Sequence, residues 1–408
     1  MRSLLVRLHR WFGLFMAVFL FIAGLTGAII SWDHELDEWL NPELFEAKSG
    51  VVAADLQREP LDLARALEAH DPRIVVTYLP LSIEPGHALG VSVGPRPDPA
   101  TGLAVEPGFN QVALDPVSGA VQGQRQWGAI SLSRENLLPF LYKLHYSMHI
   151  PDGFGIDLGM LFMGIVGIVW VLDCFIALWI SFPSLAAWRK SFAFRWRQGG
   201  YKLNFDLHRS GGVWVWGLLL ILAVTSVSMN LGTQVVRPIV NRISPLTPSV
   251  FAERAPTPED RPIAAVFTRE QILAAARAEA IARGWSAPAG DIFYSEHYGV
   301  YGVGFFAPGA EHGDGGLGNP SMYFDSTTGK LLSAQLPGAG SAGDLFMDLQ
   351  FPLHSGRILG LPGRILVSAL GLVVALLSAT GVVIWARKRR ARQRSAERAS
   401  GALVGANS

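Results

Sequence analysis

The sequence is poor in cysteine and in charged residues. Cys174 is the only cysteine among 408 residues, so an internal disulfide and a thiolate-based zinc or iron–sulfur site are excluded. No C-x-x-C-H motif occurs, which excludes covalent attachment of a c-type haem. Only 16% of the residues are charged, against about 25% in soluble domains, and 50% are hydrophobic. The composition indicates a membrane protein, and a net charge of +1 gives no reason to expect nucleic acid as a partner.

The sequence does contain four apolar stretches that are long enough to cross a lipid bilayer. A helical span needs about 20 residues, and the stretches cover residues 11–32, 158–182, 211–231 and 363–385. Basic residues precede the first stretch, as in a signal peptide. However, the stretch is too long for a signal sequence and no clean small-x-small cleavage site follows it. We therefore expect all four stretches to be retained as spans.

The charged residues are distributed unevenly along the chain. Segments 1–10, 183–210 and 386–408 together carry a net charge of +14, whereas segments 33–157 and 232–362 carry −13. By the positive-inside rule, both termini and the short connection lie in the cytoplasm and the two long segments lie outside. The predicted order is the cytoplasmic N-terminus and first span (1–32), first external domain (33–157), second span (158–182), basic cytoplasmic loop (183–210), third span (211–231), second external domain (232–362), fourth span (363–386) and basic cytoplasmic tail (387–408).

The two external segments have the same pattern. Each starts with an amphipathic helix, at 61–69 and 268–283, continues with three strand-like runs, and ends in a D-x-x-[ST]-G turn at 115–119 and 325–329. The predicted fold is therefore an α-helical integral membrane protein with four transmembrane helices in two tandem repeats and two external α+β domains.

Histidines follow the same duplication. His9 and His208 open the first and third spans in the motif L-H-R, and His145 and His354 precede the second and fourth spans in the motif L-H. Both halves start inside, so a pseudo-two-fold axis would run along the membrane normal. Such an axis brings His9 to His208 at the cytoplasmic end and His145 to His354 at the external end.

Two facing neutral imidazoles can fill both axial positions of a b-type haem iron, so the arrangement predicts two haems. The alternative is that the duplication copied structural histidines that hydrogen-bond across the axis. Two glycines would leave room for a porphyrin, and four basic residues are placed to pair with haem propionates. These are Gly13 and Gly212, then Arg10 and Arg209 at the inner end and Lys143 and Arg357 at the outer end.

The sequence leaves the roles of several residues undecided. His149 follows His145 by one turn of an expected helix over 134–149, so it competes with His145 as the outer ligand or joins His34 at a separate external site. Asp173 is the only carboxylate within a span, which marks either a functional group or an acid paired inside the bundle. The loop around His312 is read as a flexible hairpin tip.

The sequence resembles the PepSY-associated transmembrane family. The resemblance lies in the motifs L-H-R-x-x-G (8–13 and 207–212), L-H-Y-S (144–147) and L-H-S-G (353–356), together with the two external units. Its members include siderophore reductases of the bacterial inner membrane. The resemblance implies a di-haem b oxidoreductase with periplasmic PepSY-like domains that reduces Fe(III)-siderophore, with His9 and His208 at the inner haem and His145 and His354 at the outer one. Some relatives carry a fused flavin module. Because only a short basic tail follows Trp385, we expect quinol or a cytoplasmic flavoprotein to be the donor.

Two other functions compete with this one. A non-enzymatic membrane sensor or scaffold, or a regulator of a peptidase, would use the external domains and would need no haem. A metal-chelate permease would need broken helices near the middle of the membrane, and the four stretches read as uninterrupted.

Overall fold

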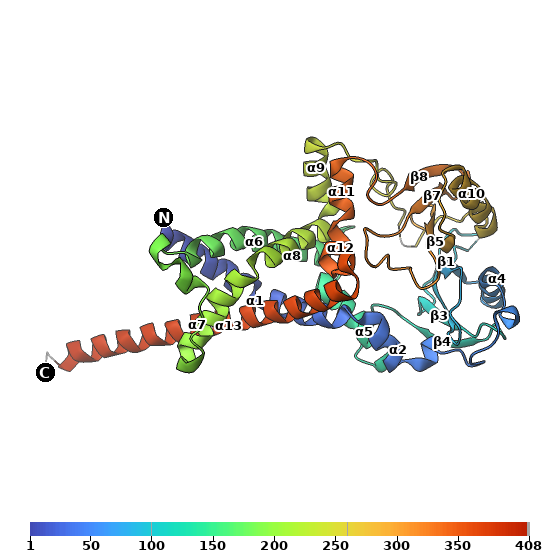
Figure 1. The fold of residues 1–408 in the computed structure, drawn as a ribbon. Coiled ribbons are helices and arrows are strands. Elements are labelled where there is room, and N and C mark those ends of the chain that lie inside the picture. Colours follow the sequence, from blue (N-terminus) through green and yellow to red (C-terminus); the bar gives the residue numbers. More distant parts are fainter. Residues whose placement is uncertain (99, 259, 406–408) are drawn as a thin grey trace.

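The computed structural model describes residues 1–98, 100–258 and 260–405. Long helices form an elongated bundle, and a sheet with short helices lies beyond one end of it (Figure 1). Three helices are long and apolar enough to cross a membrane, namely α1 (Arg2–Ile30), α6 (Leu158–Ser181) and the N-terminal part of α13 (Leu361–Gly405). The third predicted span corresponds to two helices, α7 (Gly200–Trp214) and α8 (Trp216–Asn230), which are bent by 72°.

The bend between α7 and α8 is a departure from the sequence analysis, which expected an unbroken span at 211–231. Three glycines lie within four residues of Val215, where helix propensity is therefore low. The indole of Trp214 donates to the carbonyl of Phe192, and the indole of Trp216 donates to the carbonyl of Cys174. The two helices are thus tied to different neighbours on either side of Val215. The sequence analysis argued against a permease because the spans read as unbroken. This span is broken, so that argument does not apply to it.

The four spans pack in two cross-half pairs. Helix α1 of the first half lies along α13 of the second, and α8 of the second half lies along α6 of the first. A Cβ added to Gly24 would lie 2.5 Å from the carbonyl oxygen of Gly371, and one added to Gly371 would lie 2.5 Å from the carbonyl oxygen of Gly24. Small residues at such a crossing let two helix backbones touch, which strengthens van der Waals packing within a membrane.

The two segments predicted to be external, 33–157 and 232–362, contain the predicted helices and one more strand per half than predicted. The first half supplies α2 (Asp33–Leu40), α3 (Pro42–Phe45), α4 (Pro60–His70), β1 (Ile74–Pro80), β2 (Leu89–Pro95), β3 (Gln111–Leu114), β4 (Val121–Arg125) and α5 (Leu137–Ser147). The second half supplies α9 (Arg237–Ile243), α10 (Arg269–Ala282), β5 (Ala289–Ser295), β6 (Val300–Phe305), β7 (Ser321–Asp325), β8 (Leu331–Gln335), α11 (Ala342–Asp348) and α12 (Gln350–Ser355).

The two D-x-x-[ST]-G turns have the same hydrogen bonds. Asp115 accepts from the backbone and hydroxyl of Ser118, and Asp325 accepts from the backbone and hydroxyl of Thr328. Each turn connects the third strand of its half to the fourth, β3 to β4 and β7 to β8. The strands after the turns escaped prediction because they lie at the sheet edges, where side chains are only partly buried and the apolar alternation is weak.

The two external units share one eight-stranded antiparallel sheet, in the order β4-β3-β2-β1-β5-β6-β7-β8. The equivalent strands β1 and β5 are neighbours at its centre, with Tyr78 opposite Phe293 and Pro80 opposite Asp291. This pairing covers one of the two exposed edges that each four-stranded unit would have alone. The units that sequence analysis treated as two domains are therefore joined through their backbones.

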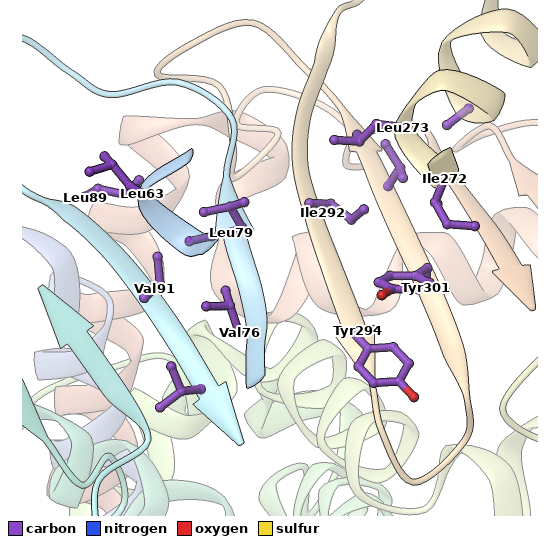
Figure 2. Packing of buried hydrophobic residues seen from close by; sticks show 14 of the residues in the cluster. Leu63, Val76, Leu79, Leu89, Val91, Ile272, Leu273, Ile292, Tyr294 and Tyr301 are labelled. Atoms are coloured by element: carbon purple, nitrogen blue, oxygen red, sulfur yellow. The ribbon is translucent and has the colours of Figure 1, made fainter. Parts of the chain in front are cut away.

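One hydrophobic core runs beneath both halves of the sheet. Leu63 of α4 packs with Leu79 of β1 and Leu89 of β2, and Ile272 of α10 packs near Ile292 of β5 (Figure 2). All five side chains are almost completely buried. Helices α4 and α10 lie on the same face of the sheet, away from the membrane bundle (Figure 1). The shared core and the shared sheet hold the two halves in a fixed relation beyond the bundle.

Candidate functional site

The first candidate site lies at the end of the bundle that is farther from the sheet (Figure 1). His9 of α1 and His208 of α7 face each other with 6.0 Å between the centroids of their rings and 47° between the ring planes. One ring comes from each half of the chain. The short helical segments that carry them, Leu8–Arg10 and Leu207–Arg209 in sequence, are the duplicated L-H-R motifs.

The second candidate site lies at the end of the bundle that adjoins the sheet. His145 of α5 and His354 of α12 face each other with 6.1 Å between ring centroids and 63° between ring planes. Again each half supplies one ring. The structure thus brings together the same two pairs that the duplication predicts, at opposite ends of the spans.

Hydrogen bonds fix the orientation of the outer rings. His145 Nδ1 donates to the carbonyl oxygen of Ala23 at 2.9 Å. His354 Nδ1 lies 2.9 Å from the hydroxyl oxygen of Thr225. That hydroxyl already donates to the carbonyl of Ile221, so it accepts from the imidazole. Both outer rings therefore carry their proton on Nδ1.

The inner rings are held in the same way. His208 Nδ1 donates to the carbonyl oxygen of Leu377 at 2.9 Å. His9 Nδ1 lies 2.9 and 3.0 Å from the two carboxylate oxygens of Asp173. Each acceptor comes from the same half as the histidine: α6 holds the His9 ring and α13 holds the His208 ring. The four rings share one tautomer, which leaves a lone pair on each Nε2.

The spacing of each pair suits a metal between two Nε2 atoms. With metal–nitrogen bonds of about 2 Å and ring centroids roughly 1 Å behind the nitrogens, the centroids would lie about 6 Å apart. In the described part of the chain, no group of three or more His, Cys, Asp or Glu side chains fits a metal ion. A haem iron needs only axial ligands from the protein, so two facing imidazoles suffice for it.

Two arginines beside the inner pair have the character expected of carboxylate ligands. The Nε atoms of Arg10 and Arg209 are buried and have no hydrogen-bond partner among the described residues. A buried guanidinium nitrogen without an acceptor is costly, and a carboxylate supplies a charge-assisted one. The outer end differs: Arg357 is already paired with Asp314 at 2.8 Å, and Lys143 has no ion pair within the described ranges. Arg209 also donates through its terminal nitrogen to the carbonyl of Lys190 and lies 3.9 Å from Asp206, so each end offers one or two basic groups with donors left for a carboxylate.

Glycines give the rings and their surroundings room. Apart from its chain neighbours and the backbone of its own helix, no described atom lies within 4 Å of the position that a Cβ on Gly13 would take, and at Gly212 only Leu377 comes within that distance. Gly27 and Gly381 make closer contacts, since a Cβ on either would lie 2.9 Å from Cε1 of His145 or His208 respectively. The latter two glycines let the rings lie directly against α1 and α13.

His149 does not occupy the position expected for it. Helix α5 ends at Ser147, and both Met148 and His149 have positive φ angles, of 53° and 52°. The His149 ring stacks on Phe140 with 4.6 Å between centroids, and its Nε2 donates to the Phe140 carbonyl. The expected helix over 134–149 is thus shorter, and the His149 ring packs on Phe140.

His34 has a partner that sequence reasoning did not foresee. Its ring lies 6.3 Å from that of His312 and 5.8 Å from that of Phe45. The alternative in which His149 joins His34 has no supporting contact among the described residues. The loop of His312, read as a free hairpin tip, contacts the start of the first external segment and carries Asp314, which pairs with Arg357.

Sequence reasoning also missed Thr26 and Thr225, whose hydroxyls lie 3.2 and 2.9 Å from Nδ1 of His145 and His354. A signal for them is present: each threonine follows the first histidine of its half, His9 or His208, by 17 residues. Gly27 and Gly381 have no such signal, because neither position is occupied by glycine in the other half under the same alignment.

Comparison with known proteins identifies the family of the chain. The model of the family described as PepSY-associated TM region matches residues 6–388, which include both histidine pairs, the spans and the external sheet. No curated protein matches the chain. The match covers nearly the whole sequence, and the chain therefore belongs to the family of PepSY-associated TM regions, as a membrane protein.

Proposed function

We propose that this protein is a di-haem b oxidoreductase of the bacterial inner membrane that passes electrons to Fe(III)-siderophore in the periplasm. The two cross-half histidine pairs carry the proposal, because they combine the same spacing, tautomer and duplicated origin at opposite ends of the spans. Structural histidines that merely hydrogen-bond would use their ring nitrogens on each other. Here Nδ1 is used on a neighbouring helix, and Nε2 remains for a ligand.

When bound, a b-type haem at each pair would supply a one-electron Fe(III)/Fe(II) couple. The chain's own residues have separate tasks. His9 and His208 would hold the inner group, and His145 and His354 the outer one. Arg10 and Arg209 would bind propionates with their unpartnered Nε atoms. The helix pairs α1–α13 and α6–α8 would keep the two sites at a fixed separation.

The external segments fit an acceptor on the periplasmic side. They carry a net charge of −13, which favours a neutral or cationic chelate over an anionic one. Adding one electron to a chelated ferric ion gives a ferrous ion, which hard oxygen ligands hold less tightly, so iron would be released. The electron would come from quinol in the bilayer or from a cytoplasmic flavoprotein that docks on the basic face of segments 183–210 and 386–408.

Visible spectroscopy of the purified full chain tests the haem assignment. We expect a Soret band in the oxidised protein and sharp α-bands after dithionite reduction, with pyridine haemochrome analysis giving two haems b per chain. A protein without a Soret band, expressed in haem-replete cells, would overturn the proposal and favour the sensor or scaffold alternative.

Iron release tests the reaction itself. The dithionite-reduced protein, freed of excess reductant, would be mixed anaerobically with an Fe(III)-trihydroxamate and a ferrous chelator. We expect about one ferrous ion for each haem oxidised, since each couple carries one electron. Haem that stays reduced in the presence of the chelate would contradict the ferric reductase assignment while leaving the haem assignment intact.

A further inference from the structure

We propose that Asp173 is a positioning residue for His9 and that its charge makes the inner site the lower-potential site of the two. The inference rests on the proposed haem occupancy, and it assigns a direction to the electron path. It also assigns a role to the one carboxylate in a span whose role the sequence left open.

The geometry ties Asp173 to one ring alone. Both carboxylate oxygens lie within 3.0 Å of His9 Nδ1, and the Asp173 side chain is only 9% exposed. Two oxygens around one nitrogen hold the ring in a defined orientation and keep the proton on Nδ1. The Nε2 atom is thereby directed toward His208 as a lone-pair donor.

No fixed cation neutralises this carboxylate. His9 is its only ion-pair partner among the described residues, although arginines are numerous at this end of the bundle. Arg195 pairs with Asp206, and Arg2 donates to the carbonyl of Ile180. A charge in a low-dielectric interior acts on its neighbours far more strongly than one in water. The charge of Asp173 is therefore directed into the His9 ring.

The other three histidines have neutral acceptors. His208 donates to a backbone carbonyl, with the Thr380 hydroxyl at 3.3 Å, His145 donates to a carbonyl, and His354 donates to a hydroxyl. A carboxylate partner makes an imidazole more basic and more electron-rich than a carbonyl partner does. An electron-rich ligand stabilises the ferric state relative to the ferrous state, which lowers the reduction potential.

This difference sets the direction of transfer. With the lower potential at the cytoplasmic end, an electron moves downhill from the inner to the outer site, toward the side where the acceptor is proposed. The duplication alone would give two similar sites and no preferred direction. In the structure the direction of electron transfer depends on one difference between the repeats. Helix α6 places an aspartate beside His9, whereas α13 places only neutral groups beside the equivalent His208.

An optical redox titration of Asp173→Asn tests the inference. The asparagine amide oxygen still accepts from His9 Nδ1 but carries no charge. We expect two haems as in the wild type, a clear rise of one midpoint potential and no change in the other. Combining the substitution with His354→Ala, which should leave only the inner haem, identifies which potential moves. Two haems with both midpoint potentials unchanged would overturn the inference.

Two further variants keep the test decisive. Thr380→Val removes a neutral hydroxyl from the same pair while His208 keeps the Leu377 carbonyl, so the midpoint potentials should stay in place. If Asp173→Asn fails to bind the inner haem, Asp173→Glu retains the charge and should retain the low potential; a raised potential there contradicts the inference. A wild-type protein without haem would instead refute the proposed function, which the absorbance spectrum alone reveals.

Discussion

The two halves of the chain have the same order of elements, yet they hold their histidines with different partners. In the first half, His9 is bound to the carboxylate of Asp173 and His145 to a backbone carbonyl. In the second half, His208 is bound to a carbonyl and His354 to the hydroxyl of Thr225. Duplication preserved where the imidazoles lie. The groups that accept hydrogen bonds from them changed, and these groups decide how each ring is oriented.

The halves also differ in how tightly the helices enclose the rings. At the inner end, Gly381 of α13 lies against the His208 ring, and at the outer end Gly27 of α1 lies against the His145 ring. The other two rings have no glycine in such contact within the described chain. One ring of each pair is therefore fixed sterically, and its partner is fixed mainly through its hydrogen bond.

Removing a ring should have the largest effect. We expect His208→Ala and His354→Ala each to lose about one of two haems, because an axial ligand is absent from one site only. Pyridine haemochrome analysis of each variant measures the remaining haem. Full haem content in both variants would show that the cross-half pairing does not hold haem. His149→Ala serves as the control and should keep both haems, since that ring stacks on Phe140.

Closing the space beside one ring should have the next largest effect. Gly381→Ala places a Cβ 2.9 Å from Cε1 of His208, so the ring must shift and the inner haem should be largely lost. Gly13→Ala is the matched probe, because no described atom lies within 4 Å of its Cβ position. If the haem-free Gly13→Ala variant is as thermally stable as the haem-free wild type but retains haem less well, a porphyrin occupies the space beside Gly13. Equal haem content in Gly381→Ala and the wild type would contradict the steric role of Gly381.

The two halves of the sheet also differ in a buried carboxylate, which should make the stability of the protein depend on pH. After β1 the chain continues with Leu81, whereas after the equivalent β5 it continues with Glu296. Burial, with a smaller contribution from the charge of Glu106, raises the pKa of Glu296 from 4.5 to about 7. The folded state thus holds a proton that the unfolded state releases, so stability falls as pH rises from about 4.5 to about 7.

Glu296→Gln should remove that slope. We expect the variant to match the wild type near pH 4.5 and to be more stable above pH 7, by at most about 3 kcal/mol, the equivalent of the pKa shift. Thermal unfolding of the full chain in detergent at both pH values measures the difference. An identical pH dependence in both proteins would show that Glu296 does not titrate on folding.

The threonines behind the outer rings should give the smallest effect and the finest comparison. Thr225 is the only hydrogen-bond partner of His354 among the described residues, whereas His145 has the Ala23 carbonyl in addition to Thr26. Thr225→Val should therefore weaken retention of the outer haem by about 1 kcal/mol, or several-fold, and Thr26→Val should have less effect. Transfer of haem to apomyoglobin gives the two rates. A larger effect of Thr26→Val would reverse the assignment of partners.

Much of the arrangement was predictable because it depends on pattern alone. The four apolar stretches, the helices near 61–69 and 268–283 and the two aspartate turns follow from hydrophobic periodicity and local hydrogen bonding. The bend at Val215 was missed because apolar content gives no information on where a helix changes direction. The joining of β1 to β5 was missed because each unit was read separately, and strand pairing between distant segments leaves no local signal.

The sequence by itself determined the membrane class, the duplicated order of elements and which histidines face each other, because these depend on spacing and on the symmetry that a repeat imposes. Only the tertiary structure decided what stands behind each ring. Asp173 lies 164 residues from His9, Thr225 lies 129 residues from His354, and each contact exists only once the helices have packed. The structure also pairs His145, and not His149, with His354, since helix α5 ends at Ser147 and both Met148 and His149 have positive φ angles.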